Sequence, residues 1–90
     1  MITGILTHEV ENFDTWLQGF NSDATIRVAA GVRIKGVYQG IDNANTVTII
    51  SEADSEEHYD RMFSHPAFVD RMRAAGVTGE PDLKMTAQVV

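Results

Sequence analysis

The residues of this sequence best suited to acid–base chemistry are its three histidines, His8, His58 and His65. An unperturbed imidazole titrates close to neutral pH, so it can take up or release a proton under physiological conditions. His8 shares one face of an alternating segment with Leu6, which would place it at the mouth of a cleft as a general base. His65 stands before Pro66 as a candidate base. The alternatives are a surface histidine at a strand end for His8, an exposed first-turn residue for His65, and a solvent-facing side chain for His58.

Two further polar side chains suit ligand recognition. Tyr38 is expected on the apolar face of a strand, where its hydroxyl can donate a hydrogen bond to a ligand oxygen, and it is the third catalytic candidate. Arg27 is a candidate clamp for a carboxylate or an enolate. The competing interpretations are a core tyrosine and an Arg27–Asp23 ion pair, because residues four apart are neighbours on a helix.

Aromatic side chains at helical spacing are the remaining candidates for a binding site. Trp16 and Phe20 lie one turn apart, and Phe63 and Phe68 belong to a later helical region. Pocket walls are mostly apolar, but ordinary core packing uses the same residues. Trp16 is the better pocket candidate because its indole N–H needs a partner when buried. The expected ligand-binding residues are Trp16, Phe20, Arg27, Phe63 and Phe68.

The sequence lacks the motifs of several other kinds of site. It has no cysteine, and its histidines do not have zinc-binding spacing, so neither a disulfide nor a metal site is expected. It also has no glycine-rich phosphate loop, no nucleophile elbow and no paired-carboxylate motif. Covalent catalysis and nucleotide binding are therefore not expected.

Charge and hydropathy limit the partners. The formal net charge is −6, from 13 acidic and 7 basic residues, which disfavours nucleic acid and anionic membrane surfaces as partners. The apolar stretches fall short of the ~20 residues that a membrane span needs. The N-terminus lacks the basic region of a secretory signal. A cytoplasmic location is the expectation.

Secondary-structure patterns place these candidates on a β-α-β-β-α-β order. Asn12 is the expected N-cap of the first helical region, which breaks near Ser22 and ends at Gly31. The second helical region opens at Asp54 and is interrupted before Pro66, so that Ser64 is expected to cap its second half. Alternation predicts strands over residues 2–10, 32–40, 46–52 and 83–90.

This order predicts an α+β fold of the ferredoxin-like type in a single domain spanning residues 1–90. The four strands would form an antiparallel sheet with both helical regions on one face. The second face is mixed, with Val37 and Ile50 beside charged residues, so it meets either water or a partner. A chain of 90 residues is marginally stable alone. We therefore expect a homodimer through the sheet face, with a solvated face as the alternative.

The chain resembles the dimeric α/β-barrel superfamily, in particular small antibiotic biosynthesis monooxygenase-like and cyclase-like proteins. The resemblance spans nearly the whole chain, and its motifs are mostly structural. Similar proteins commonly have Ser-Pro without an intervening histidine, so no role is carried over to His65. The matching residues are Thr7-His8-Glu9-Val10, Phe13, Trp16, Phe20, Arg27, Ala30-Gly31-Val32, Val37-Tyr38, Asp42 to Asn45, Phe63 to Phe68, Met72 and Ala74 to Pro81.

The resemblance implies homodimers whose sheets pack face to face, and a cleft between sheet and helices that takes small aromatic or polyketide-like ligands. Members include oxygenases without metal or flavin, cyclases, isomerases and haem-degrading proteins, so the fold alone does not select a reaction. Three hypotheses follow. The first is an oxygenase or cyclase without a cofactor, the second a non-catalytic ligand-binding or auxiliary dimer, and the third a haem-binding protein that uses a histidine.

Overall fold

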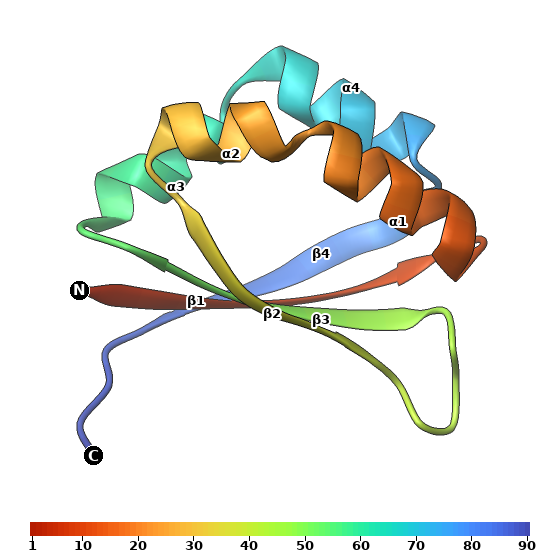
Figure 1. Cartoon of the computed structure of the whole chain (residues 1–90), viewed down its shortest axis with the longest axis horizontal. Coiled ribbons are helices and arrows are strands. Elements are labelled where there is room, and N and C mark those ends of the chain that lie inside the picture. The colour runs from red at the N-terminus through yellow and green to blue at the C-terminus, as the bar shows by residue number, and fades with distance from the viewer.

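A computed structural model describes all 90 residues, Met1–Val90, as one antiparallel sheet covered by helices on one side (Figure 1). The order of the elements is the predicted β-α-β-β-α-β order, with each helical region divided in two. The elements are β1 (Ile2–Val10), α1 (Phe13–Ser22), α2 (Ala24–Ala30), β2 (Arg33–Gln39), β3 (Thr46–Ala53), α3 (Glu56–Phe63), α4 (Pro66–Ala74) and β4 (Val77–Thr86).

The sheet has the strand order β2-β3-β1-β4, and every neighbouring pair is antiparallel. All four helices lie over the same face, and the other face carries none (Figure 1). We call these the covered face and the open face. This is the ferredoxin-like α+β fold that the sequence predicts.

Local capping signals explain where the helices begin and end. The Asn12 side chain accepts a hydrogen bond from the Thr15 N–H at 3.0 Å, as predicted. Gly31 ends α2 with φ of 79°, a left-handed conformation that glycine adopts without steric cost. The predicted cap of the last helix is wrong by one residue. His65, not Ser64, is the N-cap of α4, because its Nδ1 accepts the Ala67 N–H at 3.2 Å.

The last strand also differs from its prediction. The strand β4 begins at Val77 instead of residue 83, and the turn expected at Gly79–Pro81 is an irregularity within it. Proline cannot donate to a strand ladder, so the register with β1 jumps from Asp82 to Thr78 across these residues. Residues 87–90 leave the sheet without a partner strand and run away from the helices (Figure 1).

A bulge in β2 reverses the predicted faces beyond it. Ile34 pairs with Ser51 and Gly36 with Ile50, so Lys35 is an extra residue on β2. Because strand side chains alternate, one extra residue exchanges the two faces. Val37 consequently packs on the core of the covered face, and Tyr38 lies on the open face with 57% of its surface exposed. Both were predicted on the opposite faces.

The covered face supplies the core. Alternate residues of β1 and β3 point under the helices, and they are the most buried ones in the chain, including Val47 and Ala53 at 0% exposure. The core has two clusters. The first is centred on Trp16 and the second on Tyr59. The longest helices have 10 residues or fewer, and none is both long and apolar enough to span a bilayer.

Candidate functional site

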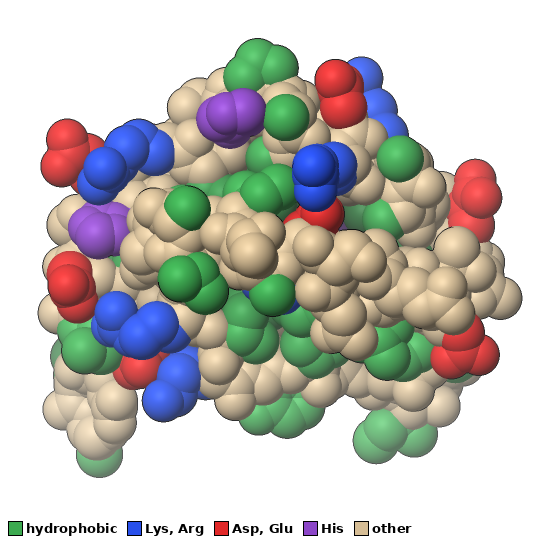
Figure 2. Space-filling model, turned by 45° about the horizontal axis from the view of Figure 1, so that its top comes forward, with side chains coloured by type: hydrophobic (Ala, Val, Ile, Leu, Met, Phe, Trp, Pro, Cys, Tyr) green, Lys and Arg blue, Asp and Glu red, His purple; other side chains and the backbone are tan.

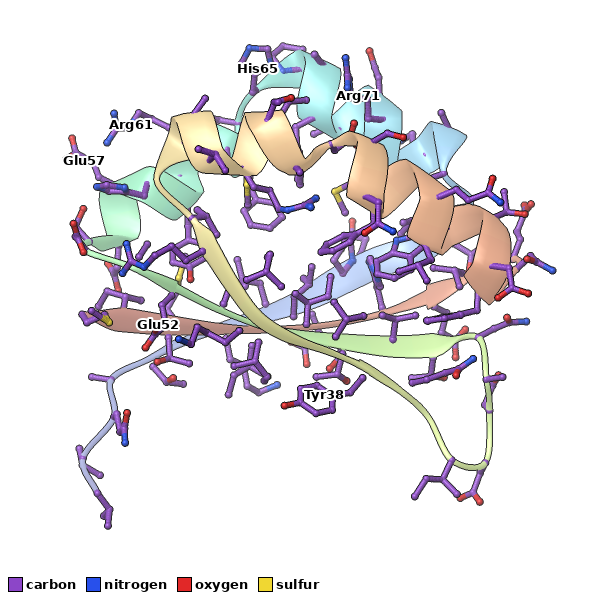
Figure 3. The ribbon with its side chains drawn as sticks, viewed as in Figure 1. Tyr38, Glu52, Glu57, Arg61, His65 and Arg71 are labelled. Carbon is purple, nitrogen blue, oxygen red and sulfur yellow. The ribbon has the colours of Figure 1, made fainter.

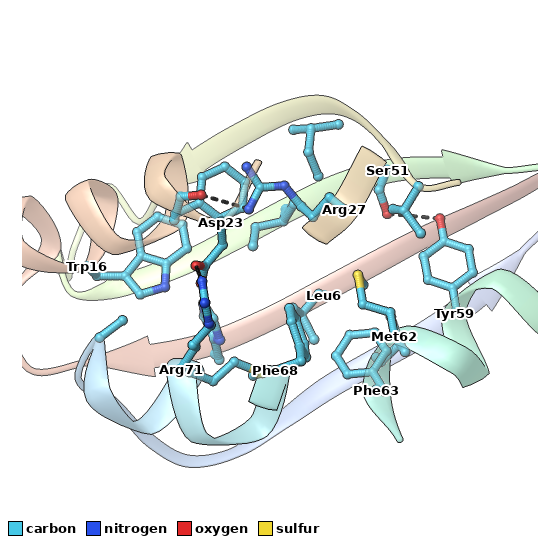
Figure 4. Close-up of a pocket in the computed structure, with 18 residues that line it drawn as sticks. Leu6, Trp16, Asp23, Arg27, Ser51, Tyr59, Met62, Phe63, Phe68 and Arg71 are labelled. Carbon is cyan, nitrogen blue, oxygen red and sulfur yellow. Dashed lines mark hydrogen bonds and ion pairs between the residues drawn. The ribbon is translucent and has the colours of Figure 1, made fainter. Parts of the chain in front are cut away.

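A cleft lies between the covered face and the helices, and it joins the two core clusters (Figure 4). β1 and β3 provide its floor, while α1, α2, α3 and α4 provide its roof. The lining is mainly hydrophobic, and its polar members are few. The lining residues are Leu6, His8, Trp16, Phe20, Asp23, Arg27, Val32, Ile34, Ile49, Ser51, Tyr59, Met62, Phe63, Phe68, Arg71, Met72, Ala75 and Leu83.

The cavity inside this cleft has a volume of about 60 Å³. Sites for small molecules typically measure roughly 300–1,000 Å³, so the cleft as it stands admits water-sized molecules only. A larger ligand therefore requires the roof helices to move. The ion pair between Asp23, which joins α1 to α2, and Arg71 on α4 ties the roof together, with 2.6 Å between Oδ1 and Nη1 (Figure 4).

His8 points from β1 into this cleft. Only 5% of its surface is exposed, and neither ring nitrogen has a hydrogen-bond partner. Its ring meets the edge of Trp16 at 87°, with 5.5 Å between the ring centroids. Desolvation by burial lowers the pKa of His8 below its usual 6.5. His8 is therefore a neutral imidazole at pH 7, with one free lone pair and one free N–H inside an apolar cleft.

A stacked aromatic wall continues from His8 along α1. Trp16 stacks on Phe20 with 5.0 Å between centroids and an angle of 29°. Phe63 and Phe68 meet edge to face on the opposite side of the cleft, 5.3 Å apart. The structure thus brings together in one cleft all five side chains expected to bind a ligand, and a ligand-binding role for them stays a prediction.

Arg27 stands at the far end of that wall. Its surface is 8% exposed, its Nη1 donates a hydrogen bond to the Phe20 carbonyl at 2.7 Å, and its Cζ lies 3.7 Å from the centroid of the Phe20 ring. Desolvation lowers the pKa of Arg27, and the charge of Asp23 opposes that effect. The predicted Arg27–Asp23 ion pair is wrong, because the Asp23 carboxylate binds Arg71 instead.

A buried hydroxyl pair at the other end of the cleft was missed by sequence reasoning. The hydroxyls of Ser51 and Tyr59 lie 2.9 Å apart, and the Ser51 Oγ donates to the Gly4 carbonyl at 3.4 Å (Figure 4). The available signal was a serine on the apolar face of β3, because a buried hydroxyl needs a partner. The partner itself comes from α3 and is set by the packing of that helix.

Two of the three catalytic candidates lie outside the cleft, so their predicted placement is wrong. Tyr38 is on the open face, as the bulge in β2 requires, and His65 is exposed on the outside of the roof, where it caps α4 (Figure 3). His58 is not simply solvent-facing either: its Nδ1 is buried without a partner, against Gly31. Of the three histidines, only His8 lines the cleft.

The surface carries no feature that points to a different class of site. Basic and acidic side chains are interspersed on the helix-bearing side, without a continuous basic patch (Figure 2). No group of three or more His, Asp or Glu side chains is placed to hold a metal ion.

Comparison with solved structures gives the fold its relatives. A presumed antibiotic biosynthesis monooxygenase from Bordetella bronchiseptica superposes with a TM-score of 0.81 at 14% identity, over 99% of this chain and 97% of that one. SnoaB, a cofactor-independent oxygenase from Streptomyces nogalater, gives 0.74 at 19% identity, over 99% and 95%. An uncharacterized NIPSNAP domain protein from Burkholderia xenovorans gives 0.71 at 14% identity, over 99% and 95%.

No family model matches the chain, and no curated protein matches it in sequence. The structural likeness confirms the expected resemblance at the level of the fold. It covers nearly the full length of each chain compared.

Proposed function

We propose that this protein is a cytoplasmic homodimer that binds a small aromatic or polyketide-like molecule in the cleft and acts on it as a monooxygenase or cyclase without a cofactor. The observation that carries the proposal is the buried His8, whose two nitrogens lack partners beside Trp16. An unpartnered buried polar group costs roughly 1–3 kcal/mol, so its presence favours a role that a ligand completes. The fold shared with SnoaB, described as a cofactor-independent oxygenase, supports the same reading.

The proposed chemistry starts with proton abstraction. The neutral His8 takes a proton from a methylene group activated by an adjacent ketone and aryl ring, leaving a carbanion. In the monooxygenase case O₂ oxidises the carbanion to a hydroperoxide, which gains the proton from His8 and loses water. The methylene becomes a ketone, one oxygen atom enters the product and the other leaves as water. In the cyclase case the carbanion attacks a second carbonyl of the same molecule, and O₂ is not consumed.

Anthrone tests this proposal because it is a tricyclic ketone with an acidic methylene group. The wild-type protein is expected to accelerate O₂ uptake and to form anthraquinone and water in equal amounts. His8→Gln should lower the rate by about 10²–10⁴-fold, which is the usual contribution of a general base. His65→Asn is the matched control, since His65 lies outside the cleft and asparagine is a good N-cap.

The outcomes separate the alternatives. Equal rates for His8→Gln and wild type would contradict the role of His8. Binding of anthrone without any conversion, seen as a shift of the single Trp16 indole signal, would support a non-catalytic binding protein instead. The haem hypothesis requires His8, the histidine of the cleft, to reach iron, and an unchanged visible spectrum on haem titration would exclude it.

The homodimer rests on the open face of the sheet. Ile5 and Ile50 are paired across β1 and β3, half-buried on this face, and Tyr38 projects beside them (Figure 3). An uncovered sheet with apolar side chains on its second face gains stability by pairing with another. Ile50→Lys should convert the dimer into a monomer in sedimentation velocity, whereas Ile41→Lys, at the fully exposed hairpin turn, should not. A wild-type monomer at micromolar concentration would contradict this part of the proposal.

A further inference from the structure

We infer that the ligand of the cleft carries an acidic group, a carboxylate or an acidic phenol on an aromatic ring, and that Arg27 is its counter-ion. This inference rests on the proposed function, because it names the class of molecule that the same cleft takes.

The first argument is the charge left uncompensated in the cleft. No carboxylate oxygen lies within 4.0 Å of the Arg27 guanidinium, although the chain has 13 acidic residues. Asp23, the acidic residue that lines the cleft, is bound to Arg71. The cleft therefore holds two cations and one anion. A buried cation with only a carbonyl and an aromatic ring as partners leaves part of its desolvation cost unmet, and an anion would meet it.

The second argument is the arrangement of the wall between His8 and Arg27. His8 contacts the edge of Trp16, Trp16 stacks on Phe20, and Arg27 lies over the Phe20 ring. The neutral imidazole and the guanidinium thus stand at opposite ends of one aromatic surface. A planar molecule on this surface can present an acidic substituent to Arg27 and its reacting carbon to His8.

The third argument is access. Arg27, Val32 and Ile34 line the cleft and also an open hollow on the outside, between α2 and the edge strand β2. The Arg27 side chain therefore forms part of the partition between cleft and solvent. A ligand entering from this side meets the guanidinium first. Guanidinium binds carboxylates through two parallel hydrogen bonds, which favours a carboxylate over a neutral amide of the same shape.

The test compares 1-naphthoate with 1-naphthamide, which differ in charge and hardly in shape. Binding is read from the indole N–H of Trp16, the only tryptophan of the chain, in a ¹H–¹⁵N correlation spectrum. The wild-type protein should bind naphthoate at least about tenfold more tightly than naphthamide. Arg27→Met should bring the ratio close to one while naphthamide still binds, and Arg27→Lys should keep part of the preference. Arg33→Met is the matched control, since Arg33 is exposed and pairs with Asp54.

Three results would overturn the inference. Equal affinity of the wild type for the two probes would remove the anion preference and leave the cleft as a neutral ligand site. A naphthoate preference that persists in Arg27→Met would assign it to another group. A Trp16 signal that neither probe shifts would reject the inference together with ligand binding in the cleft.

Discussion

Two buried polar sites lie on the covered face, four residues apart along the same pair of strands. Gly4 of β1 pairs with Ser51 of β3, and His8 pairs with Val47, so the sites are about 13 Å apart along the strands. At the first site the Ser51 and Tyr59 hydroxyls bond to each other and to the Gly4 carbonyl. At the second site the imidazole of His8 has no partner at all.

The comparison separates a structural polar site from a candidate functional one. Burial is nearly equal, with 6% of Ser51 and 5% of His8 exposed, so exposure does not distinguish them. Hydrogen bonding does, because a satisfied pair stabilises the fold whereas an unpartnered group costs free energy. We therefore expect mutations at the Ser51–Tyr59 end to lower stability and mutations at the His8 end to lower activity.

The largest expected effect on stability is that of Gly4→Ala. A Cβ at this position would lie 2.9 Å from the Tyr59 ring, closer than real contacts allow. Overpacking of this kind costs roughly 1–3 kcal/mol of the free energy of unfolding, measured by urea denaturation. Gly36→Ala is the control: its Cβ would meet Tyr38, which is exposed and free to turn away. Equal losses for the two variants would show that the Tyr59 site is not specially rigid.

Ser51→Ala should have the next largest effect. It removes the partner of the Tyr59 hydroxyl at a fully buried position, and we expect a loss of about 1–2 kcal/mol in urea denaturation. Tyr59→Phe removes the other half of the pair, and the double variant should cost less than the sum of the two single ones. Strict additivity would contradict a direct Ser51–Tyr59 interaction.

His8→Leu should act in the opposite direction. It replaces an unpartnered imidazole by an apolar side chain, so the free energy of unfolding should rise by about 1 kcal/mol while anthrone oxidation is lost. Val47→Ala, opposite His8 on β3, is a core truncation and should lower stability instead. A destabilised His8→Leu protein would mean that His8 has a structural role like that of Ser51.

The smallest effect is the pH dependence that His8 contributes. Its pKa is lower in the folded protein than its usual 6.5, so the unfolded chain binds more protons between the two values. Stability should therefore fall as the pH drops below 6.5, level off below the folded pKa, and be complete above 6.5. The slope cannot exceed about 1.4 kcal/mol per pH unit for one proton. Urea denaturation from pH 5 to 8 should show this slope in wild type and not in His8→Leu; parallel curves would contradict it.

Most of the fold could be predicted from the sequence because its signals are local. Alternation in β1 assigns His8 to the same face as Leu6, and helical spacing in α1 assigns Trp16 and Phe20 to one face. Both assignments agree with the structure. Gly31 ends α2 for a reason that depends on its own φ of 79°. No distant contact is needed to predict these features.

The candidate site could be predicted only in part because its details depend on distant partners. The bulge at Lys35 exists only in the pairing with β3, and it moves Tyr38 out of the cleft. Asp23 binds Arg71, a residue 48 positions away, instead of the neighbouring Arg27. Helical spacing favoured the local pair, and the packing of α4 against the α1–α2 joint decided otherwise.

The sequence by itself therefore determined the order of the elements and which side chains face the helices, because periodicity and capping act within a few residues. Only the tertiary structure decided which polar groups remain unpartnered. His8 and Ser51 have the same position on the strand pattern, yet Tyr59 from α3 reaches one and nothing reaches the other. The physical reason is that hydrogen-bond satisfaction depends on where a third element docks, and neither strand encodes that position.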